Sequence, residues 1–144
     1  MASSALGHAA CTVALRMGLD GSVPGAVRAA LDDLGAEPTL AIVEVCAPGS
    51  PLLAGRALAH AAELIAEEAP GCTVIGSSAH GVIGMSHAQA GARVASVEME
   101  PAISVWLAHL PGAHPRAFRL ATVPGPNGGL AITGLPDLRE GDRQ

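Results

Sequence analysis

Two serines and a histidine follow an apolar run in the middle of the chain, at Ser77, Ser78 and His80. The stretch 73–84 reads TVIGSSAHGVIG, so glycines stand on both sides of these polar residues. Hydroxyl and imidazole groups can hydrogen-bond a small ligand, and a serine with a histidine can also act as a nucleophile with its base. We expect this stretch to form a recognition loop at the open end of a strand. Its expected ligand-binding residues are Gly76, Ser77, Ser78, His80 and Gly81.

Known phosphate-binding and catalytic patterns match this stretch in part. Gly76 and Gly81 have the spacing of the two P-loop glycines, but Val82 stands where the P-loop has lysine. Gly76 precedes Ser78 as in a hydrolase nucleophile elbow, but His80 occupies the position of the second glycine. A hydrolase built on Ser78 and His80 stays open as an alternative. A purely structural alternative is a tight turn whose serines hydrogen-bond nearby backbone groups.

A second candidate strand end lies at residues 46–50. Ligands of open α/β sheets bind outside the carboxyl ends of the strands, so both ends would face one cleft if their strands were neighbours. Ser50 precedes Pro51 and is expected to cap a helix whose free amides favour an anionic group such as a carboxylate. Glu44 lies inside an apolar run, where a carboxylate needs a partner, a proton or solvent. Ser50 and Glu44 therefore join the expected site, with a structural ion pair as the alternative for Glu44.

The histidines and cysteines form no compact metal-binding pattern. Cys72, His80 and His87 have seven and six residues between them, which matches no zinc motif. His60 falls on the polar side of a helical pattern, where a solvated residue is expected. We expect neither a metal ion nor another cofactor.

Composition excludes several classes of function. All eight basic residues are arginines, so Schiff-base, pyridoxal phosphate, P-loop and protein-kinase chemistry that needs a lysine amine is excluded. A formal net charge of −5 without a basic cluster argues against nucleic acid and anionic membranes as partners. The apolar run 40–47 is far shorter than the roughly 18 residues of a membrane span. With three widely spaced cysteines, we expect a cytoplasmic protein.

Hydrophobic spacing predicts the order strand, helix, strand, helix, strand in the first half of the chain. The expected helices run from a cap at Ser22 to Gly35 and from the cap at Ser50 to Ala69. A Pro/Gly-rich loop is expected at 123–129. The expected strands are 11–17, 39–46 and 72–75, followed by 93–99, 103–110 and 116–121. This order predicts an α/β fold, with a mixed sheet whose βαβαβ first half is followed by antiparallel strands and with helices packed on the sheet.

The length of 144 residues suits one domain with a substantial aliphatic core. The sequence contains no internal repeat and no sign of a second core. We expect residues 1–144 to form a single domain that is incomplete at its C-terminus and ends in a polar tail at 136–144.

Two stretches together resemble a known family. The stretch TVIGSSAHGVIG at 73–84 and the stretch PAISVWLAHLPG at 101–112 are similar to the N-terminal FIST domain, and the strand at 39–46 and helix at 52–69 follow the same order. The resemblance covers most of the chain. It implies an intracellular sensory domain of bacterial signal transduction that binds a small ligand such as an amino acid. It also implies a partner, either a C-terminal FIST domain or another signalling protein, outside this chain.

One position departs from the family. Ser77 stands where FIST domains often carry a cysteine, so no role of that thiol is carried over to this chain. The leading hypothesis is a non-enzymatic sensory domain that binds a small ligand at strand carboxyl ends. A protein-interaction or scaffold domain is the first alternative, and the hydrolase is the second.

Overall fold

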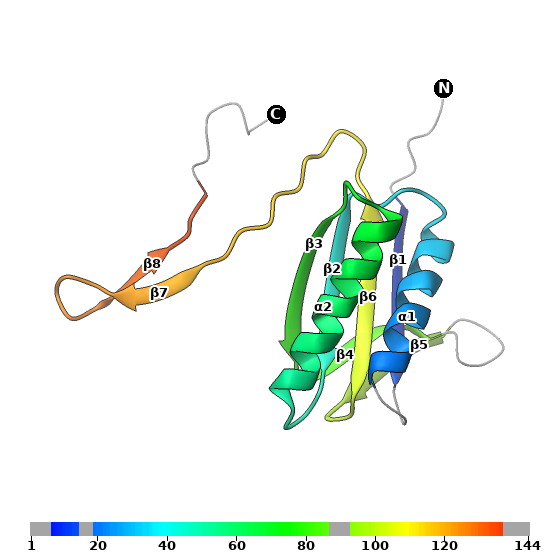
Figure 1. Ribbon diagram of the computed structural model, residues 1–144, viewed down its shortest axis with the longest axis horizontal. Coiled ribbons are helices and arrows are strands. Elements are labelled where there is room, and N and C mark those ends of the chain that lie inside the picture. Colours follow the sequence, from blue (N-terminus) through cyan, green and yellow to red (C-terminus); the bar gives the residue numbers. More distant parts are fainter. Residues whose placement is uncertain (1–6, 15–18, 87–92, 137–144) are drawn as a thin grey trace.

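Two helices pack on one face of a six-stranded mixed sheet (Figure 1). The computed structural model of the chain describes residues 7–14, 19–86 and 93–136. His87 and, apart from Pro136, the expected polar tail 136–144 lie outside the described residues. The elements in chain order are β1 (Gly7–Ala14), α1 (Leu19–Leu34), β2 (Leu40–Cys46), α2 (Pro51–Glu68), β3 (Thr73–Ala79), β4 (Gly81–Ser86), β5 (Arg93–Glu98), β6 (Ala102–His109), β7 (Ala121–Pro124) and β8 (Leu130–Thr133).

The sheet has the strand order β3-β2-β6-β1-β4-β5. β2 and β3 are parallel neighbours, whereas β6 lies between β1 and β2 and runs antiparallel to both. β4 pairs parallel with β1 and antiparallel with β5. The predicted α/β class and mixed sheet are confirmed. The condition for a shared cleft also holds, because the carboxyl ends of β2 and β3 lie side by side.

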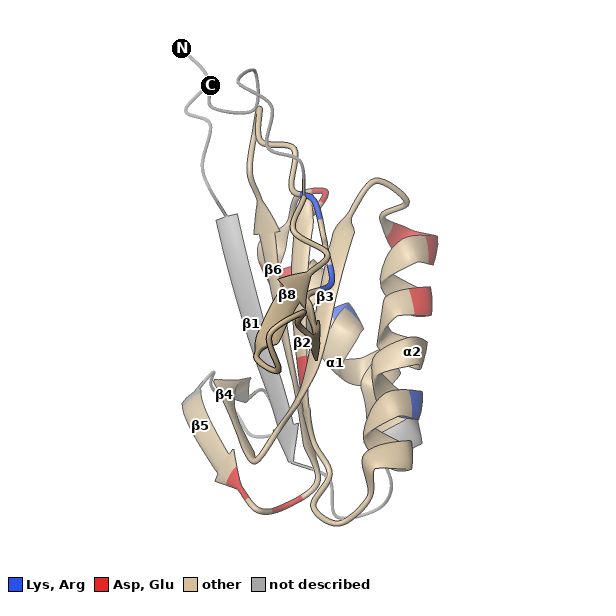
Figure 2. Ribbon diagram, turned by 90° about the vertical axis from the view of Figure 1, so that its left-hand side faces the viewer, with Lys and Arg blue, Asp and Glu red and all other residues tan. Residues whose placement is uncertain are grey.

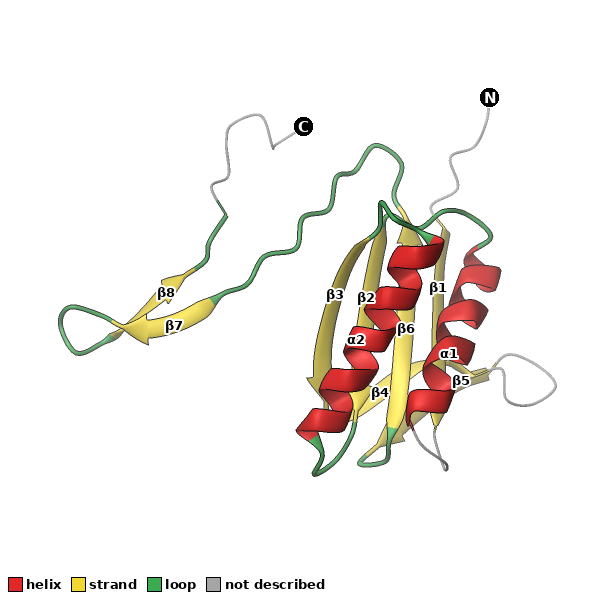
Figure 3. Cartoon of the chain, in the orientation of Figure 1, coloured by secondary structure: helices red, strands yellow, loops and turns green. Residues whose placement is uncertain are grey.

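The main core lies between the sheet and the helices (Figure 3). In β2, buried and half-buried residues alternate, because successive side chains of a strand point to opposite faces. β6 is aligned with β2, so Ile103, Val105 and Leu107 face the helices as well, whereas Ala102 and Ser104 are buried on the other face. Burying each such aliphatic side chain contributes about 1.5–3 kcal/mol to folding. The largest fully buried aliphatic side chains are Val23, Val43, Val45, Ile65, Ile103, Val105 and Leu107.

The hairpin of β4 and β5 covers part of the face that carries no helix (Figure 2). The Ser104 hydroxyl in β6 donates a hydrogen bond of 3.1 Å to the carbonyl oxygen of Ile83 in β4. Val82 packs with Cys46 and Ala102 in a second, smaller cluster. After β3 the chain therefore crosses over β2 and β6 before it reaches β1.

Several expected boundaries were wrong. α1 begins at Leu19, so Ser22 is a helical residue and no cap, and Pro24 lies inside the helix, where it cannot donate a hydrogen bond to the carbonyl of Asp20. The strand expected at 72–75 continues to Ala79, so Gly76, Ser77 and Ser78 belong to β3 and form no loop. The extension is favoured because β2 runs alongside all seven residues of β3 and supplies hydrogen-bonding partners along that side of the strand.

The C-terminal described segment, residues 116–136, forms an arm that projects from the body (Figure 1). The strand expected at 116–121 does not form, because its residues before Ala121 have no neighbouring strand in the described structure. Part of the expected loop 123–129 instead belongs to the hairpin of β7 and β8. Gly128 has a φ of 73° in the turn of this hairpin, a conformation that glycine adopts without strain.

Candidate site at the carboxyl ends of β2 and β3

A cavity of about 290 Å³ opens where β2 and β3 end and α2 begins. One wall is the loop from Ala47 to Ser50 with the first turn of α2, and the other is formed by Ser78, Ala79 and His80. Met99, which follows β5, also lines it. The two strand ends that the sequence indicated therefore face one cavity.

The first turn of α2 borders this cavity, and its free amides are those of Leu52 and Leu53, because Pro51 has no amide hydrogen. Ser50 is the N-cap residue and Pro51 the first helical residue, as expected, but the Ser50 side chain makes no capping hydrogen bond. Ser50 contributes its carbonyl, which accepts a hydrogen bond of 3.1 Å from the Ala54 amide. The amides of the first helical turn and the helix dipole together favour a negatively charged group at this end of α2.

A second cavity, of about 500 Å³, lies on the helix-free side of the sheet. Its lining includes the carboxylate-bearing residues Glu44 and Glu98, together with Gly81 and His80. Glu44 is half-buried in β2 and is aligned with Ser77 of β3 and Ser104 of β6. The Glu44 carboxylate thus belongs to an acidic hollow on the face opposite to α2.

The structure divides the expected site residues between the two faces of the sheet. Ser78 aligns with Val45 and lines the α2 cavity, whereas Ser77 aligns with Glu44 on the other face. Gly76 lines neither cavity, because it lies beneath α2, where a Cβ atom would be 3.0 Å from Leu58 Cδ2. The alternation of side chains along β3 causes this division.

His80 lies at the bend between β3 and β4 and lines both cavities. Its carbonyl oxygen accepts a hydrogen bond of 2.9 Å from the Met99 amide and one of 3.1 Å from the Cys46 thiol. Two donors from separate parts of the chain thus fix the backbone of the crossing. The imidazole itself is exposed.

The polar groups at this crossing are available to a ligand. Within residues 7–14, 19–86 and 93–136, the hydroxyls of Ser77 and Ser78 and the ring of His80 make no hydrogen bond to the protein. The alternative in which these serines satisfy the backbone of a tight turn is therefore not what the structure contains. All three side chains face solvent, and Ser78 and His80 also line the α2 cavity.

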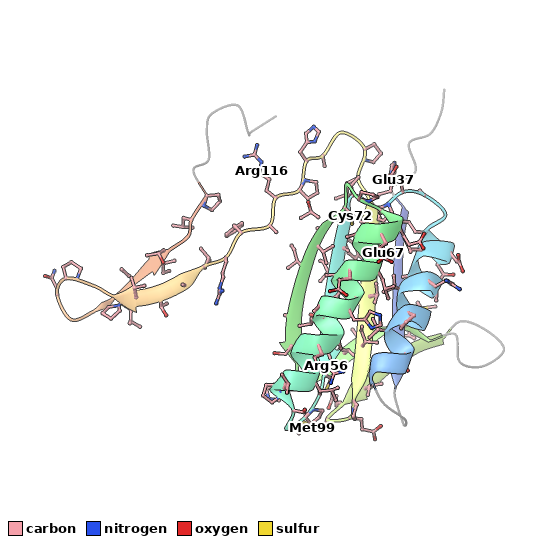
Figure 4. All side chains as sticks on the ribbon, viewed as in Figure 1. Glu37, Arg56, Glu67, Cys72, Met99 and Arg116 are labelled. Carbon is pink, nitrogen blue, oxygen red and sulfur yellow. The ribbon has the colours of Figure 1, made fainter. Side chains whose placement is uncertain are left out.

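Met99 is a site residue that the sequence did not indicate. It was expected at the end of a strand, but it follows β5 with a φ of 56°, in the left-handed region that non-glycine residues rarely adopt. Such a conformation is unfavourable by about 1–2 kcal/mol and persists where the surroundings determine it. Figure 4 shows Met99 at the end of the sheet where α2 begins and Cys72 at the opposite end. Pro101, two residues later, is the signal that could have indicated a turn here.

Cys72 lies at the other end of the sheet from the two cavities. Burial raises the pKa of the half-buried Cys72 thiol above its ordinary value.

In the three described segments of the chain, no cluster of three or more His, Cys, Asp or Glu residues could hold a metal ion. The two helices of the described structure are too short or too polar to cross a membrane.

Comparison with family models, with curated proteins and with solved structures gives no match to this chain. The likeness to the N-terminal FIST domain therefore rests on the residues of the stretches 73–84 and 101–112.

Proposed function

We propose that this chain is a non-enzymatic sensory domain that binds a small molecule with an anionic group, such as an amino acid, in the α2 cavity. The observation that carries the proposal is that the first turn of α2, Ser78 and His80 line one cavity. The FIST-like stretches add a signalling role, with a further FIST domain or another signalling protein as its partner.

The chemistry of the cavity suits such a ligand. The positive end of the α2 dipole would attract a carboxylate, and Ser78 and His80 would hydrogen-bond a second polar group. The volume of about 290 Å³ lies near the lower end of the roughly 300–1,000 Å³ that pockets for drug-sized molecules occupy, which favours a small ligand. Ala47 and Ala54 supply apolar contacts.

The hydrolase alternative receives less support. Ser78 and His80 line the same cavity, but their side chains make no hydrogen bond to each other in the structure described. A serine nucleophile needs its base within about 2.6–3.2 Å and a third group to orient that base. Binding requires neither arrangement, so it explains the geometry with fewer conditions.

Thermal unfolding in the presence of individual amino acids and small carboxylates tests the proposal. A ligand at one hundred times its Kd stabilises the folded state by about 2.7 kcal/mol, which corresponds to roughly 5–10 °C in Tm for a chain of this size. The rise in Tm should saturate with ligand concentration. Isothermal titration calorimetry with the same compound should give one site per chain.

Two adjacent serines provide a matched pair of variants. Ser78→Ala should weaken binding, because Ser78 lines the α2 cavity, whereas Ser77→Ala should leave it unchanged, because Ser77 lies on the other face. Equal effects of the two substitutions would contradict the assignment of the site to this cavity. A folded protein that responds to none of the compounds would contradict the proposed function.

A further inference from the structure

The arm exposes an unusual amount of apolar surface for its length. Residues 116–136 project from the body in Figure 1, and their only described pairing is that of β7 with β8. A lone two-stranded hairpin is at best marginally stable in water, so it gains stability when it packs against another surface. The exposed large side chains of the arm are Phe118 (57%), Leu120 (49%), Val123 (37%), Leu130 (79%), Ile132 (62%) and Leu135 (69%).

The sheet offers such a surface at the outer edge of β3. The Thr73 amide donates a hydrogen bond of 3.0 Å to the carbonyl of Thr39, on the β2 side. Because hydrogen-bonding directions alternate along a strand, the backbone groups of Val74, Gly76 and Ser78 point outward. No described strand pairs with this edge.

The edge also lacks the features that normally prevent pairing with another chain. The sequence of β3, TVIGSSA, contains no charged residue and no proline, and all seven residues pair with β2 without a bulge. Natural edge strands are usually protected by lysine, proline, a bulge or a covering loop. β3 is therefore competent to accept an added strand.

The arm and the body complement each other in length and charge. Eight residues from Arg116 to Val123 span about 26 Å when extended, against about 23 Å for the seven residues of β3. Residues 116–136 contain two arginines and no acidic residue, whereas residues 21–115 contain nine acidic residues and three arginines. Figure 2 shows the acidic positions on α2 and at the end of β5. The basic, apolar arm of one copy is therefore complementary in charge to the acidic body of another copy.

We propose that the segment Arg116–Val123 of one copy adds as a strand to the outer edge of β3 of a second copy, and that the two copies exchange arms reciprocally. Within one copy, the Thr73 hydroxyl donates a hydrogen bond of 2.8 Å to the carbonyl of Pro115, so the base of the arm is held at the start of β3. From there the arm leads away from its own β3, as Figure 1 shows. A two-fold pair satisfies both edges and both arms with one self-complementary contact.

The alternation of the arm fits this exchange. Phe118 and Leu120 share one side of an added strand, next to Ile75, which is 45% exposed on the helix-free face. Ser78 lies both on the β3 edge and in the α2 cavity, so the exchanged strand would run past the mouth of that cavity. The exchange does not depend on ligand binding.

Light scattering after size-exclusion chromatography of the full chain tests the exchange over a range of concentrations. We expect a dimer that dissociates on dilution. The double substitution Phe118→Glu with Leu120→Glu should weaken dimerisation by more than about tenfold, because unpaired carboxylates would enter the apolar contact. Leu52→Glu is the matched control, since Leu52 is 77% exposed on α2, and it should leave the dimer intact. A wild-type monomer at every concentration would overturn the proposal, as would a double variant that dimerises like the wild type.

Amide hydrogen exchange identifies the edge involved. The amides of Val74, Gly76 and Ser78 should be protected in the dimer and become exposed on dilution. Ser78→Pro removes one outward amide without removing a hydrogen bond to β2, so it should weaken dimerisation in a protein with unchanged circular dichroism. Protection of these amides in a monomer would mean that the arm folds back on its own sheet. Either that result or an unprotected edge in the dimer would contradict the exchange.

Discussion

Replacing Gly81 with alanine should destabilise the protein far more than replacing Gly76, although both glycines flank the same serines. Neither has a positive φ, so the difference does not come from backbone conformation. At Gly81 a Cβ atom would lie 2.9 Å from the Val97 carbonyl oxygen and 3.1 Å from Glu98 Cγ. Backbone atoms of β5 cannot rotate away, so the β4–β5 hairpin must shift.

The expected loss of stability depends on which atoms the new Cβ atom of alanine would contact. Overpacking of this kind is unfavourable by about 1–3 kcal/mol, so we expect Gly81→Ala to lower the free energy of unfolding by that amount. At Gly76 the nearest atom is the end of the Leu58 side chain, which can move. Alanine also loses less conformational entropy on folding than glycine, by roughly 0.5–1 kcal/mol, so Gly76→Ala should stay within about 1 kcal/mol of the wild type.

Urea unfolding followed by circular dichroism and by the fluorescence of Trp106, the single tryptophan, measures these differences. With a slope of about 2 kcal/mol per molar urea, Gly81→Ala should lower the midpoint by about 0.5–1.5 M. Gly55→Ala is the control, because a Cβ atom there meets nothing within 4 Å inside α2, and it should raise the midpoint slightly. Equal losses for Gly76→Ala and Gly81→Ala, or no loss for the latter, would refute the steric argument.

Two further predictions concern a buried hydroxyl and a thiol. Ser104→Ala should lower the free energy of unfolding by about 1–3 kcal/mol, because it leaves the Ile83 carbonyl without its hydrogen-bond donor. Ser96→Ala is the control: Ser96 is exposed, so this substitution should change the free energy of unfolding by less than about 0.5 kcal/mol in the same urea experiment. Because burial raises the pKa of Cys72, the stability that depends on its protonated thiol is complete below the ordinary cysteine pKa and is lost as the pH rises through the raised value. The unfolding midpoint should therefore fall at alkaline pH, and less so in Cys72→Ala. The absorbance of thiolate at 240 nm should show the late-titrating step, free of tyrosinate because the chain has no tyrosine, and an ordinary midpoint for this step would contradict the prediction.

Local signals in the sequence predicted α2 and β2 well. Pro51 begins α2 with Ser50 as its N-cap residue, and the segment 69–71 ends it, as expected, because a proline restricts the backbone of its immediate neighbours. The sheet order could not be predicted in the same way. Insertion of β6 between β1 and β2 depends on burying Val105 and its neighbours under the helices, which is a contact between distant parts of the chain.

The expected strand at 116–121 shows that a strand-like sequence pattern alone does not produce a strand. Its residues alternate well enough for a strand, but a strand forms only where a neighbour supplies hydrogen bonds, and the described structure supplies none before Ala121. The same residues become the adding strand in the arm exchange that we propose. A β pattern in the sequence therefore indicates the capacity to pair, and the partner decides whether the strand exists.

The division of the serines follows from the length of β3. A loop after residue 75 would have allowed Ser77 and Ser78 to reach one ligand together, but a strand that continues to Ala79 places them on opposite faces. Ser78 then belongs with the α2 cavity, and Ser77 lies beside the acidic hollow that contains Glu44. A cysteine introduced as Ser77→Cys, the residue that FIST domains often carry, would therefore lie on the face away from the proposed ligand. Among the residues expected from the sequence, His80 remains the one that both cavities share, because it occupies the bend where the chain crosses from β3 to β4.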